Sequence, residues 1–308
     1  MRTFDDTGGA ERRALRARAP GDGAAALLER AAGAAVAVAR AVARFPPVQL
    51  LARAGFVGKS TLYGVVGALA LRASLGLRGG GTIDAKEALS IVFEGGRGNG
   101  AVAVLAVALG GLGFWFVLEG AIDPSGAPLT PFRAVSRIGQ AVGGLGYLAL
   151  AAVAVRIVSG EGAGPSGDEI VRMLVGQYVA LPTGRWAVAI VGVAAVIVGA
   201  RQVWLGISGA CLASLTLERV PRRLRRSARA LAVVGFPAQG GLFALVGVFL
   251  VQAALERDPG EATGTGGALH AVAASPYGSW LLLIASTGLL ACAAYAGIEA
   301  ATRRMPRP

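Results

Sequence analysis

Long apolar stretches alternate with short polar stretches along this chain, and six of the apolar stretches hold about twenty residues or more. An α-helix of that length crosses a hydrocarbon core about 30 Å thick. The six stretches are residues 54–76, 101–122, 138–158, 186–208, 230–254 and 279–301. Because lipid offers the backbone no hydrogen-bond partner, each stretch is expected to be helical. The pattern therefore predicts an all-α, polytopic membrane protein with six transmembrane helices.

The same pair of apolar stretches recurs three times. One constant offset aligns the first copy with the third without a gap, for example Gly55 with Gly235 and Glu119 with Glu299. A shorter offset places Gly55 on Gly139, so a middle copy lies between them. Self-similarity at a fixed period indicates a repeat architecture. We expect three pseudo-symmetric helical hairpins, related by an axis along the membrane normal. Their units are residues 50–124, 131–210 and 228–302.

The N-terminal part of the chain has a different pattern. Residues 1–23 mix Gly, Arg, Asp and Ala without periodicity, which predicts a disordered cytoplasmic segment. In residues 24–47 the charged and apolar positions fall on separate arcs of a helix, and Pro46 and Pro47 end it. This pattern predicts an amphipathic helix on the inner membrane surface. An Ala-rich helix packed on the cytoplasmic ends of the spans fits the same residues.

Charge alternates from one polar segment to the next. Arginine gathers before the first span, between spans two and three, between spans four and five, and in the C-terminal tail. The other three segments, near residues 77–100, 159–185 and 255–278, hold acidic residues such as Asp84, Glu161 and Glu256. Cytoplasmic segments of membrane proteins are enriched in Arg and Lys. We therefore expect a multi-pass protein of the bacterial plasma (inner) membrane with both termini in the cytoplasm.

Composition agrees with this class. The chain is 54% hydrophobic and 16% charged, with a mean hydropathy of +0.60, which excludes an ordinary soluble globule of 308 residues. The net charge of +12 comes mostly from the inner arginines. The expected partners are thus the lipid bilayer and anionic lipids at its cytoplasmic face. Nucleic acid is not expected, because no basic run is interleaved with aromatic residues.

Ionisable side chains inside spans are costly and are therefore functional candidates. The candidate intramembrane polar site consists of Lys59, Glu119, Arg201 and Glu299. Lys59 and Glu119 lie at similar depth on the two antiparallel helices of the first copy, which predicts an ion pair that holds this hairpin together. In the third copy the acid recurs as Glu299, but Gln239 replaces the lysine.

Catalytic chemistry has little support in the sequence. The single histidine, His270, has no carboxylate, cysteine or second histidine spaced for a metal site or a nucleophile–base pair. Cys211 and Cys292 lack metal-ligand spacing and are interpreted as small apolar residues. The glycine clusters have no phosphate-binding context. We expect no enzyme, no catalytic residue, no cofactor and no metal.

The residues of the repeat also carry a resemblance. The Gly55-Phe56 opening, the Leu62-Tyr63-Gly64 core followed by Gly67, and the closing Glu119 and Glu299 resemble the bacterial membrane proteins of domain-of-unknown-function family 1206. The likeness covers about residues 50–302 and implies three tandem two-span units. The middle copy departs from the pattern because Leu205 takes the acid position. The resemblance implies no activity.

Two functions from different classes fit these features. The first is a non-enzymatic scaffold or envelope-associated protein, favoured by small residues suited to close helix packing. The alternative is a channel or small-solute or ion transporter with its site on the pseudo-three-fold axis. A membrane enzyme or lipid-binding protein is a third class. Buried, mutually paired charges favour a scaffold, whereas charges that line a water-filled cavity favour transport.

Overall fold

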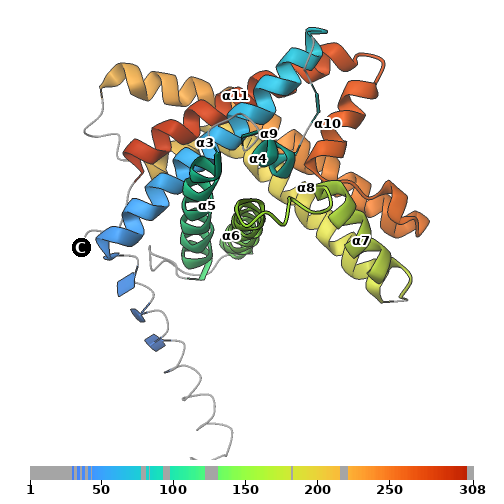
Figure 1. The fold of residues 1–308 in the computed structure, drawn as a ribbon, viewed down its shortest axis with the longest axis horizontal. Coiled ribbons are helices and arrows are strands. Elements are labelled where there is room, and N and C mark those ends of the chain that lie inside the picture. The colour runs from blue at the N-terminus through green and yellow to red at the C-terminus, as the bar shows by residue number, and fades with distance from the viewer. Residues whose placement is uncertain are drawn as a thin grey trace, which may run out of the picture.

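The structure is a computed structural model, which describes residues 30, 33–34, 37–38, 41–42, 44–77, 81–82, 84–92, 98–121, 131–181, 183–215 and 221–303 (Figure 1). The predicted disordered segment 1–23 lies outside the described residues. Of the predicted helix 24–47, isolated positions and residues 44–47 are described.

The described residues include six helices that are each long and apolar enough to cross a membrane. They are α3 (Pro46–Ser74), α5 (Gly98–Ala121), α6 (Pro131–Val158), α8 (Gly184–Ser208), α9 (Arg222–Glu256) and α11 (Gly278–Thr302). Shorter helices lie between them: α4 (Ala85–Val92), α7 (Gly167–Val179) and α10 (Thr265–Ala274). No β-strand occurs among the described residues. The prediction of an all-α, multi-pass membrane protein with six spans is confirmed.

Local sequence signals set several helix ends. Two prolines start α3, where their missing N–H groups cost nothing. Ser166 and Glu169 form a capping box at the start of α7, each side chain accepting a hydrogen bond from the other's backbone. Gly209 ends α8 in the left-handed conformation, with φ of 72°.

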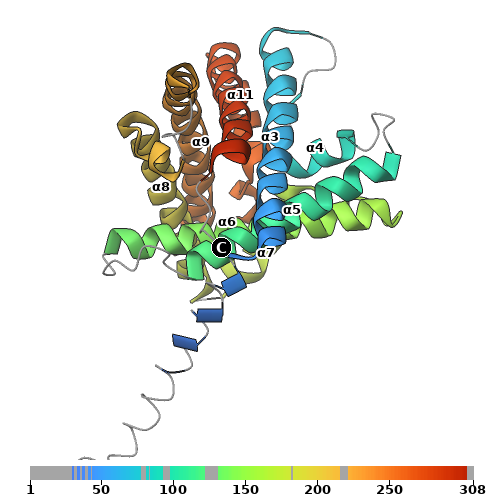
Figure 2. The same ribbon diagram turned by 90° about the vertical axis from the view of Figure 1, so that its left-hand side faces the viewer.

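The helices do not pack equally. The most extensive contacts join α5 with α6, α8 with α9, and α11 with α3. Helices α3 and α5 also pack together, as do α9 and α11, whereas α6 and α8 are in contact at only a few residues. Figure 2 shows α3, α9 and α11 standing side by side, with α5 and α6 lying across them. The contact between α11 and α3 brings the last span of the chain against the first.

Glycines allow the closest of these approaches. A Cβ added to Gly144 of α6 would lie 2.7 Å from the carbonyl oxygen of Gly113 in α5. A Cβ added to Gly247 of α9 would lie 2.5 Å from that of Gly192 in α8. Real Cβ atoms do not approach so closely, so these helix backbones touch only because side chains are missing.

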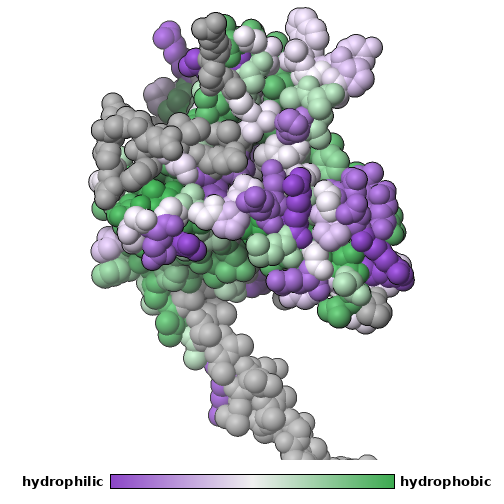
Figure 3. Space-filling model, turned by 45° about the vertical axis from the view of Figure 1, so that its right-hand side comes forward, coloured by the Kyte–Doolittle hydropathy of each residue, from purple (hydrophilic) through white to green (hydrophobic). Residues whose placement is uncertain are grey.

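The apolar side chains form both a core and a lipid-facing exterior. The largest buried cluster lies where α3, α5, α6 and α11 meet, and includes Leu62, Leu109 and Leu289. Outside, large apolar side chains such as Val104 and Ile190 are mostly exposed, at 71% and 68%. In the space-filling view, hydrophobic surface separates patches of hydrophilic residues (Figure 3). Such an exterior suits a protein that sits in a lipid bilayer.

Candidate functional site

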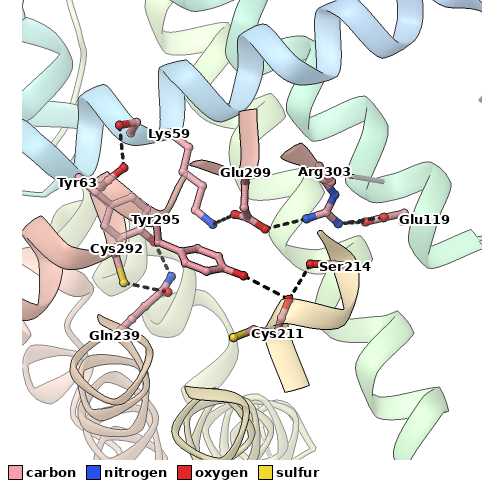
Figure 4. A network of polar contacts seen from close by, with 12 residues as sticks. Lys59, Tyr63, Glu119, Cys211, Ser214, Gln239, Cys292, Tyr295, Glu299 and Arg303 are labelled. Atoms are coloured by element: carbon pink, nitrogen blue, oxygen red, sulfur yellow. Dashed lines mark hydrogen bonds and ion pairs between the residues drawn. The ribbon is translucent and has the colours of Figure 1, made fainter. Parts of the chain in front are cut away.

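A buried arginine at the end of the last span organises the polar side chains of this protein. Arg303 follows α11 directly, and its side chain is 9% exposed. Its Nη2 atom donates hydrogen bonds of 2.9 and 2.8 Å to the two carboxylate oxygens of Glu119 in α5. Its Nη1 atom donates a hydrogen bond of 2.9 Å to Glu299, one helical turn earlier in α11 (Figure 4). Arg303 therefore connects two spans that are far apart in sequence.

A lysine from the first span completes this group. Lys59 Nζ lies 4.0 Å from Glu299 Oε2, so Glu299 sits between two cations. The carboxylate side chains are 7% exposed in Glu299 and 19% in Glu119. We call Lys59, Glu119, Glu299 and Arg303 the ionic centre. It holds two positive and two negative charges, which compensate one another where isolated charges would be costly.

Aromatic rings cover the guanidinium group of Arg303. Its central carbon lies 4.7 Å from the centroid of the Phe56 ring and 5.8 Å from that of Phe116. The two rings pack edge to face, with centroids 5.9 Å apart. Burial alone would lower the pKa of Arg303, but the carboxylates of Glu119 and Glu299 outweigh it and raise the pKa. Arg303 is therefore a permanent charge at the junction of α3, α5 and α11.

The surrounding backbone holds Arg303 in place. Leu215, in the segment after α8, forms an isolated antiparallel bridge with Arg303. Close by, Tyr295 of α11 donates a hydrogen bond of 3.1 Å to the carbonyl oxygen of Cys211. Gln140 of α6 donates a hydrogen bond of 3.3 Å to Glu119 Oε2. Four of the six spans and one connecting segment thus contribute to the ionic centre or its supports.

A second set of polar side chains lies deeper in the spans, beside Lys59. Gln239 of α9 donates a hydrogen bond of 2.6 Å to the hydroxyl of Tyr63 in α3. The thiol of Cys292 lies 3.7 Å from the amide oxygen of Gln239. The Lys59 ammonium lies 5.8 Å from the centroid of the Tyr63 ring. Figure 4 shows these residues next to the ionic centre. They join α3, α9 and α11 at the centre of the bundle.

The structure brings together three of the four residues predicted from sequence. Lys59, Glu119 and Glu299 meet in the ionic centre, whereas Arg201 donates a hydrogen bond of 2.8 Å to Ser136 and so joins α8 to α6. The predicted Lys59–Glu119 pair was wrong. Lys59 lies near Glu299 instead, because α11 packs against α3, and Glu119 pairs with Arg303.

Sequence reasoning missed Arg303 itself. It lies beyond the last apolar stretch, in the basic tail, where arginine is typical of a cytoplasmic segment. The available signal was its spacing of four residues from Glu299, which places both side chains on one face of a helix.

The site offers no donor set for a metal. No group of three or more His, Cys, Asp or Glu side chains suited to a metal ion occurs among the described residues. Cys211 and Cys292 are free thiols and both are buried. Chemically, the ionic centre can hold helices together or pass protons between its acids and Lys59.

Comparisons with known proteins found a similar bacterial protein and a matching family model. The chain is 24% identical over 251 residues to the uncharacterized protein YxxB of Bacillus subtilis (strain 168), a match that covers 82% of this chain and 90% of that protein. No solved structure matches significantly. The resemblance noted in the sequence is confirmed in α9 and α11, since residues 234–303 match the family model named Domain of Unknown Function (DUF1206).

Proposed function

We propose that the protein is a non-enzymatic scaffold or envelope-associated protein of a bacterial inner membrane. The observation that carries this proposal is the ionic centre, in which the charges of Lys59, Glu119, Glu299 and Arg303 are directed at one another. A group that moves a solute must exchange partners or reach water during its cycle. A buried, mutually compensated cluster instead fixes one arrangement of the helices.

The proposed scaffold consists of three hairpins arranged with pseudo-three-fold symmetry. Two arginines at equivalent positions of the first and second copies support this arrangement. Arg53 of α3 donates a hydrogen bond to the Ala301 carbonyl, at 3.3 Å, and Arg137 of α6 donates one to the Ala121 carbonyl, at 2.6 Å. Ala121 and Ala301 are themselves equivalent positions of the first and third copies. The family match over residues 234–303 also covers one pair of spans.

Equivalent glycines suggest that the middle hairpin is looser than the other two. A Cβ on Gly55 would clash with α5, and one on Gly235 would lie 2.8 Å from the backbone nitrogen of Cys292. A Cβ on Gly139 would meet Val198 at 3.6 Å, an ordinary contact distance. This difference agrees with the slight contact between α6 and α8.

The proposed orientation places both termini in the cytoplasm. It is supported by five exposed arginines in the first two turns of α9: Arg222, Arg223, Arg225, Arg226 and Arg229. This end of α9 extends beyond the apolar part of the span. Anionic lipids of the inner leaflet are the expected partners of such a basic helix end.

The alternative function is a channel or a small-solute or ion transporter. One observation favours it, namely that polar side chains continue inward from Lys59 through Tyr63 to Gln239. The separation of 4.0 Å between Lys59 and Glu299 is also longer than a hydrogen bond. Lys59 is therefore held less tightly than Arg303, whose contacts with its two acids are 2.8 and 2.9 Å.

Proton flux in proteoliposomes separates the two functions. The protein is reconstituted into liposomes that contain a pH-sensitive dye, and a potassium diffusion potential is applied with valinomycin. A scaffold should give the same proton uptake as protein-free liposomes, and Lys59→Met should change nothing. Proton uptake above this background that is lost in Lys59→Met, but kept in the exposed control Ser227→Ala, would contradict the scaffold and support a transporter.

Protein abundance gives the scaffold a positive test. Glu299→Gln should lower the amount of folded protein in the membrane, because it leaves Lys59 and part of Arg303 without a counter-charge. A transporter variant is expected to stay abundant and lose only flux. An abundant, stable Glu299→Gln protein would therefore count against the scaffold.

A further inference from the structure

The connecting segments at the far ends of the spans from Arg303 are tied to one another. Asp84, just before α4, accepts a hydrogen bond of 2.8 Å from the backbone of Gly167 at the start of α7. Asp168 in turn accepts hydrogen bonds of 2.6 Å from the backbone of Gly264 and 3.2 Å from the hydroxyl of Thr263, just before α10. We call these three segments and their short helices the loop face. Its geometry is fixed by buried or half-buried carboxylates.

A buried lysine lies in this fixed frame. Lys86, in the first turn of α4, is 6% exposed. Its backbone nitrogen donates a hydrogen bond of 2.8 Å to Asp84 Oδ1, so α4 is anchored to the same carboxylate that binds Gly167. Within the described part of the chain, no hydrogen bond or ion pair engages the Lys86 ammonium. An ammonium group without such a partner can accept an anionic ligand as its counter-charge.

A second cation points at the same place. The Lys86 Nζ and Arg156 Nη2 atoms both lie within 4.0 Å of the position that a Cβ would take on Gly164. Gly164 has a φ of 67° and belongs to the segment between α6 and α7. Arg156 pairs with Glu161 through its Nε atom, at 3.4 Å, which leaves Nη2 directed toward Gly164. Two positive groups from separate elements therefore converge beside one glycine.

Besides Glu161, which pairs with Arg156, three acids of the loop face accept hydrogen bonds from backbone groups. Asp84 binds two backbone N–H groups, and Asp168 binds one together with a hydroxyl. Glu169 accepts a hydrogen bond of 2.7 Å from the Ser166 N–H in the capping box. Through these bonds the carboxylates hold the loop face in shape.

We propose that Lys86 and Arg156 form a binding site for a phosphate group beside Gly164. A guanidinium and an ammonium together suit the several oxygens of a phosphate. Arg156 lies in the last turn of α6, where a span reaches the headgroup layer. A phospholipid headgroup or free phosphate can supply this chemistry.

Thermal unfolding of the purified protein in a non-ionic detergent tests the site. The added probes are phosphatidylglycerol, phosphatidylcholine and inorganic phosphate, at constant ionic strength. Near a hundredfold excess over Kd, a phosphate-bearing anionic probe should raise Tm by about 5–10 °C. A response to phosphatidylglycerol alone identifies a headgroup site, and a response to inorganic phosphate as well identifies a site open to the free ion.

The variants distinguish a ligand site from a structural lysine. Lys86→Met should melt no lower than the wild type without probe, because it removes no side-chain hydrogen bond or ion pair within the described part of the chain, and it should lose the response to the probe. Arg156→Gln should bind at least about tenfold more weakly, and Lys86→Arg should keep a response. Arg257→Gln removes an exposed cation from the same face and should respond fully. Equal responses in the wild type and Lys86→Met, or no wild-type response to any probe, would overturn the site.

Discussion

Two adjacent glycines in α9 offer a sharp test of the helix packing. Gly240 faces α8, where an added Cβ would clash with the carbonyl oxygen of Gly199 and lie 2.9 Å from a methyl group of Val203. Gly241 is the next residue along the chain, and a Cβ there would meet no atom within 4 Å. We predict that Gly240→Ala destabilises the protein and that Gly241→Ala does not.

The size of the effect follows from the close backbone contact. The obstructing atom at Gly240 is a main-chain oxygen of a helix, so α8 and α9 must separate to admit a methyl group. Overpacking of this kind costs about 1–3 kcal/mol. For a protein of this size that cost lowers Tm by about 2–12 °C. Replacing Gly241 by Ala in an open helical position is expected to stabilise by about 0.5–1 kcal/mol.

Thermal unfolding of both variants in the same detergent measures the difference directly. The pair Gly143→Ala and Gly144→Ala repeats the test in α6. A Cβ at Gly144 would lie 2.7 Å from the Gly113 carbonyl oxygen, and one at Gly143 would meet nothing within 4 Å. If the two variants of each pair had the same Tm, the glycine contacts between α8 and α9 and between α5 and α6 would not exist as described.

Three further predictions concern the ionic centre, a thiol and the topology. Glu119→Gln and Arg303→Met should each destabilise the protein. The sum of their two effects should exceed the effect of the double variant by about 1–3 kcal/mol in thermal unfolding, which is the coupling between the two side chains. Cys211 should resist N-ethylmaleimide at neutral pH until the protein unfolds, because burial shields the thiol and raises its pKa. In whole cells an impermeant thiol reagent should label Glu261→Cys and spare Ser227→Cys, both at exposed positions.

The contrary results are distinct for each of these tests. Additive effects of Glu119→Gln and Arg303→Met would mean that the two side chains do not interact. Rapid labelling of Cys211 in the folded protein would show that the segment after α8 opens. Labelling of Ser227→Cys but not Glu261→Cys would invert the proposed orientation.

The membrane-spanning part of the fold follows from apolar length, but the helix ends do not. The sixth span, predicted at 279–301, is the helix Gly278–Thr302. The fifth was predicted to begin at residue 230, whereas α9 begins at Arg222. Hydropathy detects the lipid-facing part only, while arginine is a good helix former and continues the helix outward. The short helices α4, α7 and α10 were not predicted, although Ser166 and Glu169 carry the capping signal for α7.

Three members of the ionic centre were predictable from the sequence, but Arg303 and the pairing of the charges were not. Lys59, Glu119 and Glu299 stand out because ionisable residues inside apolar stretches are costly. The sequence predicts a Lys59–Glu119 pair, because neighbouring spans are expected to form the closest contacts. The packing of α11 against α3 joins the two ends of the chain, and no local pattern in the sequence encodes that contact.

The placement of Arg303 also makes the order of synthesis matter. Glu119 enters the membrane early, but its partner lies 184 residues later. At translation rates of about 5–20 residues per second, the carboxylate waits about 10–40 s for its counter-charge. Until then, α5 carries an acid that lipid tolerates poorly. A nascent chain that stops before Arg303 therefore keeps Glu119 without its counter-charge.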